Sequence, residues 1–360
     1  MPLSGLPITR RQLFPIPFAI VANVVLRPTA EALEAWPTDG WAELEPSQAG
    51  MDGTGLRLAD QQIRAAMPDV TGIVVVRQNA LVFERYYGGR YGRRDPINIR
   101  SVTKSVVSGL VGIAIDDGLL SLDDTIGELI PDRIPDGADP RTAGITLRQL
   151  LTMTSGWAWD VPSDYPTLIA ADNWVELTLG LPVAYEPGTV YAYNTGGSHL
   201  LSVILAEVTG QDTADYAQRR LFDPLGIAKP RWERSPQREA IGGFGLELTP
   251  RDLAKFGLLY LREGEWDGKR LLPRAYVEAS TTYQAEGDTT GYAAYGFQWW
   301  VIDFPGYQAY FGLGFGSQYV YVVPALDLVV VVVKGFEEAP PAVSFSRPLI
   351  ETYIVPAVTG

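Results

Sequence analysis

The chain has 360 residues, of which 46% are apolar and 20% charged, so it can bury a sizeable core. Its formal net charge of −13, with no basic patch to offset it, argues against binding to nucleic acid. The chain has no cysteine, which excludes disulfides, a thiolate nucleophile and cysteine-bound zinc. Its single histidine, His199, excludes metal motifs that need two histidines.

The first 50 residues are expected to form an N-terminal extension. Arg10 and Arg11 precede an apolar run at residues 13–26, an arrangement that also occurs in export signals. Two prolines interrupt the run and its cleavage site is weak, so a cytoplasmic location is slightly favoured over export. The run is too short to span a bilayer, and no stable membrane span is expected elsewhere.

Periodic apolar residues predict a helix at residues 55–67 and then a hairpin with strands at 70–77 and 81–87. The long apolar run of the first strand indicates a central strand that is covered on both faces. An apolar helix follows, and it begins at about Ser101.

The middle of the chain is rich in helices and loops. A helix is predicted at residues 145–157, an aromatic loop at 157–174, and a helix from Ser198 to about Val208. The first of these helices begins with a capping box, in which the side chains of a threonine and of a glutamine three residues later each accept a hydrogen bond from the other residue's backbone N–H.

A further helix is predicted from Thr249, with proline in its first turn. Strands are then predicted at residues 295–301, 318–323 and 326–333, before a last helix at 342–354.

Strands at both ends with helices between them indicate an α+β fold in which helices flank an antiparallel sheet. The predicted α/β domain combines residues 51–120 with 246–360. A mainly helical domain at residues 121–245 is inserted between them.

Ser101 and Lys104 open the apolar helix, and their spacing of three places them on the same side of it. A lysine at its reference pKa of ~10.4 is protonated at neutral pH and cannot accept the proton of a serine. Burial and the positive potential of a helix N-terminus both lower that pKa. The pair is therefore a candidate nucleophile and base, and the alternative is a capped helix with a lysine that reaches solvent.

A site of the serine–histidine–aspartate type would have to use His199, and no serine lies in a Gly-x-Ser-x-Gly turn. His199 is interpreted as structural. Only Lys104, among the five lysines of the chain, has a serine three residues before it.

The motif Ser101-Val102-Thr103-Lys104 resembles that of the serine hydrolases of the class C β-lactamase and DD-peptidase superfamily. This superfamily also holds esterases and 6-aminohexanoate-dimer hydrolases. Supporting phrases begin at Asp117 (DGLLSLDD), Leu150 (LLTMTSG) and Leu248 (LTPRDL). The resemblance runs from about residue 53 to residue 358 and implies a β-lactamase/DD-peptidase-like fold.

The second motif of this family is a tyrosine shortly after Pro-Gly, and the resemblance assigns it to Tyr193. The family commonly has asparagine two residues further on, where this chain has Thr195, with Asn194 between them. Tyr191 is the alternative, although it better matches a buried aromatic of the family. The resemblance implies that Tyr193 shares the base role with Lys104 and protonates the leaving group. The alternative role is a turn tyrosine packed on the core.

The third motif, normally lysine or histidine, then any residue, then glycine, corresponds to Gly312-Leu313-Gly314. The side chain that helps the family bind a substrate carboxylate is therefore missing, which argues against β-lactamase and DD-peptidase activity. The resemblance still implies an oxyanion hole made by the backbone N–H groups of Ser101 and Phe315.

Residues for substrate binding are harder to select. Trp157, Trp159 and Trp174, with Tyr165, are candidates for the walls of an acyl or amide pocket, although single aromatics more often belong to the core. Gly314 and Asn194 are further candidates.

The expected function is hydrolysis of a small carboxylic ester or linear amide through a serine acyl-enzyme, without metal or cofactor. One alternative is a β-lactamase or D-amino-acid peptidase, and another is a non-catalytic relative that only binds a ligand. The oligomeric state is left open.

Overall fold

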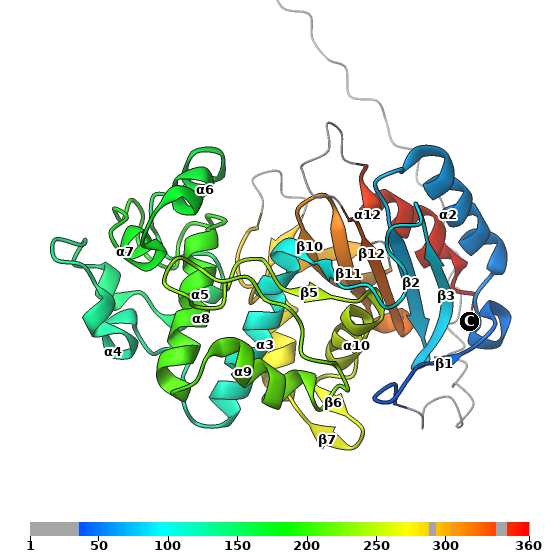
Figure 1. Ribbon diagram of the computed structural model, residues 1–360, viewed down its shortest axis with the longest axis horizontal. Coiled ribbons are helices and arrows are strands. Elements are labelled where there is room, and N and C mark those ends of the chain that lie inside the picture. The colour runs from blue at the N-terminus through cyan, green and yellow to red at the C-terminus, as the bar shows by residue number, and fades with distance from the viewer. Residues whose placement is uncertain (1–35, 288–292, 305, 336–343, 360) are drawn as a thin grey trace, which may run out of the picture.

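A sheet built from both ends of the chain organises the molecule (Figure 1). The computed structural model describes residues 36–287, 293–304, 306–335 and 344–359. The sheet has eight strands. Neighbouring strands are antiparallel except for the edge pair β1 and β3, which is parallel. In spatial order the strands are β1 (Ala42–Glu43), β3 (Ala80–Tyr86), β2 (Gly72–Arg77), β12 (Leu328–Val333), β11 (Gln318–Val323), β10 (Tyr307–Gly314), β9 (Trp300–Phe304) and β8 (Ala294–Tyr295).

Strand β2 pairs with β12 in the interior of this sheet, where residue Val75 is opposite Val330. Every residue of both strands is buried. Runs of valine suit this position because β-branched side chains pack well on a pleated surface that is covered on both faces. The predicted central strand is thus confirmed.

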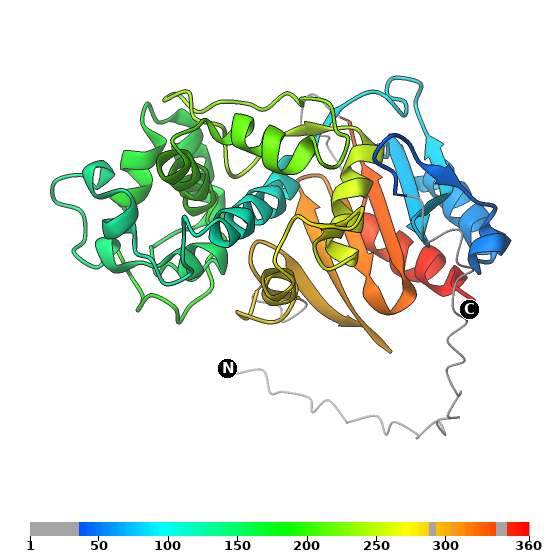
Figure 2. The ribbon, with the colours of Figure 1, turned by 90° about the horizontal axis from the view of Figure 1, so that it is seen from below.

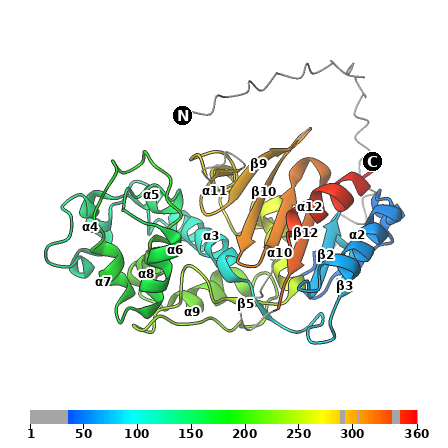
Figure 3. The ribbon, with the colours of Figure 1, turned by 90° about the horizontal axis from the view of Figure 1, so that it is seen from above.

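Helices cover the two faces of the sheet (Figure 3). One face carries α10 (Pro250–Leu261), and the other carries α2 (Gly53–Ala66) with α12 (Ser346–Leu349) and the π-helical turn η7 (Ile350–Ile354). A Cβ atom on Gly257 would lie 2.7 Å from side-chain atoms of β11 and β12, so glycine is what allows α10 to lie directly on the sheet.

The helices of the middle segment form a second body beside the sheet, and α3 (Thr103–Asp116) runs between the two (Figures 2 and 3). Its longest member is α8 (Thr195–Thr209), which packs on α3. The others are α4 (Ile126–Leu129), α5 (Leu147–Leu151), α6 (Val161–Ala170), α7 (Trp174–Leu179) and α9 (Thr213–Ala217).

Short elements connect these two parts. Strand β4 (Ile97–Asn98) leads into α3 and pairs with β5 (Glu247–Leu248), which leads into α10. The other strands and the last α-helix to be named are β6 (Glu265–Trp266), β7 (Lys269–Arg270) and α11 (Arg274–Ser280).

Three sequence-based predictions of secondary structure were wrong. The helix expected at residues 145–157 ends at Leu151, because Met153 turns the backbone to a φ of 60°. The strand expected at 295–301 is a hairpin of β8 and β9, with Gln298 at a φ of 61° in its turn. The loop expected at 157–174 contains α6.

The apolar run at residues 13–26, on which the expectation of export rests, lies outside the described residues, as does the start of the last predicted helix. No helix in the part of the chain that the structure describes is long and apolar enough to cross a membrane.

Candidate active site

Ser101 lies in a tight 3₁₀ turn, η2 (Arg100–Val102), at the start of α3. The residue before it, Arg100, has a φ of 54°, which costs a non-glycine residue about 1 kcal/mol or more. The side chain of Asn98 supports this turn, because its Oδ1 accepts a hydrogen bond of 2.9 Å from the Arg100 N–H. The strained turn places Ser101 in the wall of a cleft.

Lys104 lies one turn further along α3 and is only 1% exposed. Its Nζ lies 3.1 Å from the Oγ of Ser101 and donates a second hydrogen bond, of 2.7 Å, to the carbonyl of Gly243. Burial lowers the pKa of Lys104 to about 7, because an ammonium ion loses its hydration among the apolar side chains of α3. At neutral pH a large fraction of Lys104 is therefore an uncharged amine that can accept a proton.

Tyr193 completes this group of side chains. Its hydroxyl interacts with the side chain of Ser101, and the Nζ of Lys104 lies 4.9 Å from the centre of its ring. Burial raises the pKa of Tyr193 to about 12, although the interaction with Ser101 opposes this shift. Tyr193 therefore keeps its proton at neutral pH and can donate it.

The backbone around Tyr193 is held by Met153. The N–H of Ala192 donates a hydrogen bond of 2.8 Å to the Met153 carbonyl, and the N–H of Asn194 lies 3.3 Å from the Met153 sulfur. Tyr191, the alternative in the sequence, packs on Tyr295 with ring centres 5.3 Å apart and does not line the cleft.

The end of β10 lies against the turn that carries Ser101. A Cβ atom on Gly314 would lie 2.5 Å from the carbonyl of Ile99, so only glycine permits this approach. A Cβ atom on Gly312 would lie 3.0 Å from atoms of Val102 and Ser105, which leaves little room for the cation that the third motif usually carries. Phe315 and Ser101 consequently line the same cleft.

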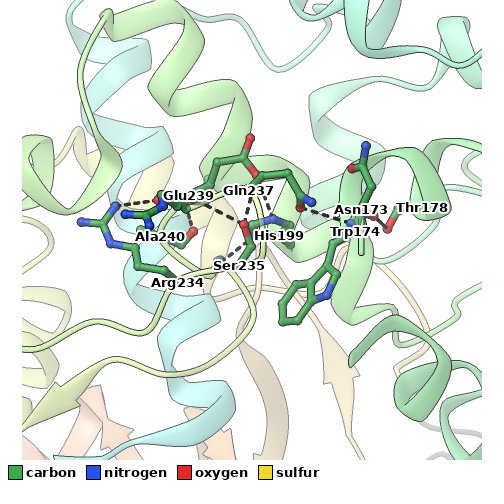
Figure 4. A network of polar contacts seen from close by, with 12 residues as sticks. Asn173, Trp174, Thr178, His199, Arg234, Ser235, Gln237, Glu239 and Ala240 are labelled. Atoms are coloured by element: carbon green, nitrogen blue, oxygen red, sulfur yellow. Dashed lines mark hydrogen bonds and ion pairs between the residues drawn. The ribbon is translucent and has the colours of Figure 1, made fainter. Parts of the chain in front are cut away.

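Figure 4 shows a polar network around His199 and Glu239. It reaches the backbone next to Gly243, whose carbonyl binds Lys104. The N–H of Gly242, next to Gly243, donates a hydrogen bond of 3.3 Å to the Nδ1 of His199. Because this Nδ1 accepts, the proton of a neutral His199 resides on Nε2, which lies 3.3 Å from a carboxylate oxygen of Glu239. Arg133 donates a hydrogen bond of 2.7 Å to the other oxygen of Glu239.

Burial alone would raise the pKa of Glu239, but the contacts with His199 and Arg133 prevail and lower it to about 2. Glu239 is therefore a carboxylate that orients the imidazole. His199 itself is fully buried and packs edge-on against Trp174, with ring centres 5.5 Å apart. It supports the site through the backbone, which agrees with its structural interpretation.

The cleft above Ser101 has a volume of about 700 Å³. Its walls are mainly apolar, and Arg100 alone carries a charge among the described residues that line it. The other lining residues are Ser101, Val161, Tyr165, Tyr193, Thr195, Phe244, Trp300, Leu313, Gly314, Phe315, Gly316, Ser317, Tyr319 and Phe345. A second cavity, of about 790 Å³, lies beside β3 and is lined by none of the candidate catalytic residues.

Of the residues selected for substrate binding, Gly314 and Tyr165 line the cleft and the four others do not. Asn194 is 2% exposed and caps α8, where its Oδ1 accepts a hydrogen bond of 2.9 Å from Gly197. Trp157 and Trp174 are buried in the helical part, and Trp159 packs against a cluster that contains Trp174.

Sequence reasoning did not select Val161, Phe244, Trp300 and Phe345 as lining residues. Trp300 was assigned to a continuous strand, and Val161 to a loop. Phe244 could have been selected from its position directly after Gly242-Gly243, because a pair of glycines often marks a place where another backbone or a ligand approaches closely.

Comparison with known proteins identifies the family. A sequence model of the β-lactamase family matches residues 56–343. The chain is 23% identical over 354 residues to a 6-aminohexanoate-dimer hydrolase of Paenarthrobacter ureafaciens, covering 86% of this chain and 89% of that protein. It is 24% identical over 215 residues to the esterase EstB of Burkholderia gladioli, covering 52% and 54% of the two chains.

Among solved structures, the crystal structure of a D-stereospecific amidohydrolase from a Streptomyces species aligns with a TM-score of 0.65 at 19% identity. This alignment covers 84% of this chain and 98% of that chain. Its similarity concerns the fold, and it confirms the fold class expected from the sequence, the β-lactamase/DD-peptidase-like fold.

Proposed function

This chain belongs to the β-lactamase family, whose relatives here include hydrolases, and we propose that it hydrolyses small carboxylic esters or linear amides through an ester on Ser101. The observation that carries the proposal is the contact of 3.1 Å between the Ser101 Oγ and a lysine whose pKa is about 7. A buried amine at the start of a helix is a suitable base for a serine hydroxyl at neutral pH.

In the first half of the proposed reaction the neutral Lys104 accepts the proton of Ser101 as the Oγ attacks the substrate carbonyl. The N–H groups of Ser101 and Phe315 stabilise the negative oxygen that forms. Tyr193 donates its proton to the departing alcohol or amine and regains one from Lys104, so the protons balance. This leaves an acyl group on Ser101.

In the second half a water molecule replaces the leaving group. Tyr193 and Lys104 remove a proton from this water as it attacks the acyl carbon, and the same N–H groups stabilise the second oxyanion. The bond to the Ser101 Oγ then breaks, and the Oγ takes back a proton from Lys104. The acid product leaves and the enzyme returns to its first state.

The third motif bears on the substrate. Gly312 has no cation for a substrate carboxylate, and the walls of the cleft are mainly apolar. Both features favour esters and linear amides over β-lactams and D-amino-acid peptides, which remain the alternative substrates. The names of the esterase and the 6-aminohexanoate-dimer hydrolase among the relatives point to the same two classes.

A purely ligand-binding role is less consistent with the buried lysine. Holding Lys104 at a pKa of about 7 opposes folding, because the ammonium ion must be dehydrated or deprotonated. A binding protein would gain nothing from this cost, whereas a hydrolase needs the uncharged amine.

The test is a parallel assay of a short p-nitrophenyl ester, a chromogenic cephalosporin and a 6-aminohexanoate dimer, with Ser101→Ala as the matched variant. We expect the parent enzyme to hydrolyse the ester or the linear amide. We expect Ser101→Ala to lower the rate of this hydrolysis by at least about a thousandfold. Rapid turnover of the cephalosporin would contradict the substrate preference. Turnover that is equal in Ser101→Ala would contradict the serine mechanism.

A further inference from the structure

Exposed apolar side chains gather at the cleft. Among the described residues ten large apolar side chains are exposed, and four of them line this one cleft. These four are Val161, Tyr165, Phe315 and Phe345, with exposed fractions of 43%, 36%, 56% and 75%. Such a concentration around a catalytic cleft marks a surface that an apolar ligand covers.

Helix α6 extends this surface beyond the cleft. Val161, Tyr165 and Ile169 follow one another at intervals of four residues, so they lie along one side of the helix, and Ile169 is 41% exposed. Leu168, in contrast, is fully buried and packs in a cluster with Trp174 and Ile241. We call the three exposed residues the α6 stripe; it is about 12 Å long.

Ring contacts connect the α6 stripe to the catalytic residues. The ring of Tyr165 lies edge-on to Phe244, with centres 6.0 Å apart, and both residues line the cleft with Ser101. Phe244 directly follows Gly243, whose carbonyl binds Lys104. The apolar surface is therefore continuous from the nucleophile to Tyr165, and Ile169 lies about one helical turn further along α6.

The other wall comes from the sheet side of the molecule. Phe315 follows β10, and Phe345 immediately precedes α12, whereas α6 belongs to the helical part (Figure 1). Apolar side chains thus border the cleft from both parts of the molecule. A chain bound between them would remove apolar surface from water on both of its sides.

We propose that the substrate carries an extended apolar acyl chain of medium length, such as octanoyl, which lies along the α6 stripe while its carbonyl is at Ser101. This proposal rests on the hydrolase function proposed above and specifies its substrate class. A cleft of about 700 Å³ is much larger than an acetyl group needs. A fully buried methylene contributes about fourfold to binding, so a partly covered one contributes less, about twofold.

The first test is a series of p-nitrophenyl acetate, butanoate, octanoate and dodecanoate, each kept below its solubility limit. We expect kcat/KM to rise at least about tenfold from acetate to octanoate. A series that is flat or falls with chain length overturns this inference and leaves the proposed hydrolase function in place. If no ester is turned over in a Ser101-dependent way, the proposed function itself fails.

The second test asks whether the α6 stripe binds the chain. We expect Ile169→Ser and Val161→Ser each to lower the ratio of kcat/KM for octanoate over acetate by about threefold or more. The matched control is Leu58→Ser, an equally exposed leucine on α2 at 45%, which should leave the ratio unchanged. An unchanged ratio in both stripe variants, with thermal unfolding showing that they fold, overturns the assignment.

A lipid surface is the main competing occupant of the stripe. The distinguishing measurement is the rate of tributyrin hydrolysis as the concentration of tributyrin is raised past the point at which it forms an emulsion. Smooth saturation in solution is the expected result. A rate that rises only once the emulsion forms would mean that the stripe binds an interface, and it would overturn the assignment to an acyl chain.

Discussion

At the scale of single residues, the burial of Lys104 determines the chemistry. Lys104 is a buried residue of the apolar helix α3, and its polar partners are the Ser101 hydroxyl and the Gly243 carbonyl. Dehydration opposes the charged form and leaves an amine that is ready to accept a proton at neutral pH. The same dehydration opposes folding, so the residue that supports activity should reduce stability.

The pH dependence of activity follows from the pKa of Lys104. Because the reaction needs the uncharged amine, kcat/KM should rise as pH increases through about 7 and then level off. Tyr193, with a pKa of about 12, keeps its proton throughout this range. A pH–rate profile of the free enzyme checks this, and a flat profile between about pH 6 and pH 8 would contradict it.

The variant Lys104→Met should be inactive but more stable than the parent chain. Between the folded pKa of about 7 and the ordinary value of 10.5, the unfolded lysine binds a proton that the folded one does not. Parent stability therefore rises with pH across this window, because the unfolded state binds more protons. Methionine removes this penalty but leaves the Gly243 carbonyl without a donor, at a cost of about 1–3 kcal/mol.

Lys104→Met should thus exceed the parent by about 2 kcal/mol in free energy of unfolding at neutral pH, and the advantage should shrink by about 2 kcal/mol near pH 9. Urea unfolding of both proteins at the two pH values measures the difference. Groups other than Lys104 titrate in both proteins and cancel. A variant that is less stable at neutral pH, or an advantage that grows with pH, would contradict the account.

The sequence was informative about residues whose chemistry depends on local spacing. Ser101 and Lys104 are three apart on one helix, so their contact could be anticipated, and the structure brings Tyr193 to them as well. It was uninformative about Trp157 and Trp174, because a tryptophan can line a pocket or fill a core with equal ease. Their burial depends on how α7 and α8 pack.

At the scale of elements, the approach of β10 to the turn η2 is the contact on which the proposed oxyanion hole depends. Gly314→Ala should separate the two, because its Cβ atom would lie 2.5 Å from the Ile99 carbonyl. We expect kcat/KM to fall by about a hundredfold and stability to fall by about 1–3 kcal/mol.

Gly144→Ala is the matched control, because no atom lies within 4 Å of its added Cβ and its φ is not positive. It should keep the parent kcat/KM. Ester hydrolysis and thermal unfolding of both variants measure the two effects. Full activity in Gly314→Ala would show that the position of β10 does not matter for the reaction.

Elements were predictable where one signal dominated. The valine runs of β2 and β12 and the periodic apolar residues of α2 indicated their structure correctly. The errors at α5 and at the β8–β9 turn share a cause. Met153 and Gln298 adopt a left-handed backbone conformation, which is uncommon for their residue types and so could not be predicted from them. Only the surrounding contacts impose that conformation.

At the scale of the whole molecule, one hydrophobic core joins the sheet and the helical part. This core contains Val74 and Val331 of the sheet together with Leu200 and Ile204 of α8, all with no exposed surface. We therefore propose that the helical segment at residues 121–245, although an insertion in the chain, does not fold as a separate unit.

Unfolding should accordingly be a single cooperative transition. Tryptophans report on both parts, with Trp157 in the helical part and Trp299 beside β9. Urea unfolding curves from tryptophan fluorescence and from far-ultraviolet circular dichroism should coincide. Two separate transitions, or a stable isolated fragment of residues 121–245, would contradict a shared core.

The overall architecture was predictable because strands from the two ends of the chain had to share a sheet. The order of the eight strands was not, since β12 pairs with β2 across more than two hundred residues of intervening chain. The parallel edge pair of β1 with β3 likewise had no sequence signal. The shape of the cleft depends on these long-range pairings, which is why its lining was the least predictable part of the site.

The central claim is that the reaction passes through an acyl group on Ser101. Its most direct test is mass spectrometry of the intact protein, quenched with acid during turnover of p-nitrophenyl octanoate and then mapped by peptide digestion. The account predicts that the mass increases by one octanoyl group, located on the peptide that contains Ser101, and that the Ser101→Ala variant gains none. Turnover by the parent enzyme with an acyl group on another residue, or equal turnover by Ser101→Ala, would contradict it.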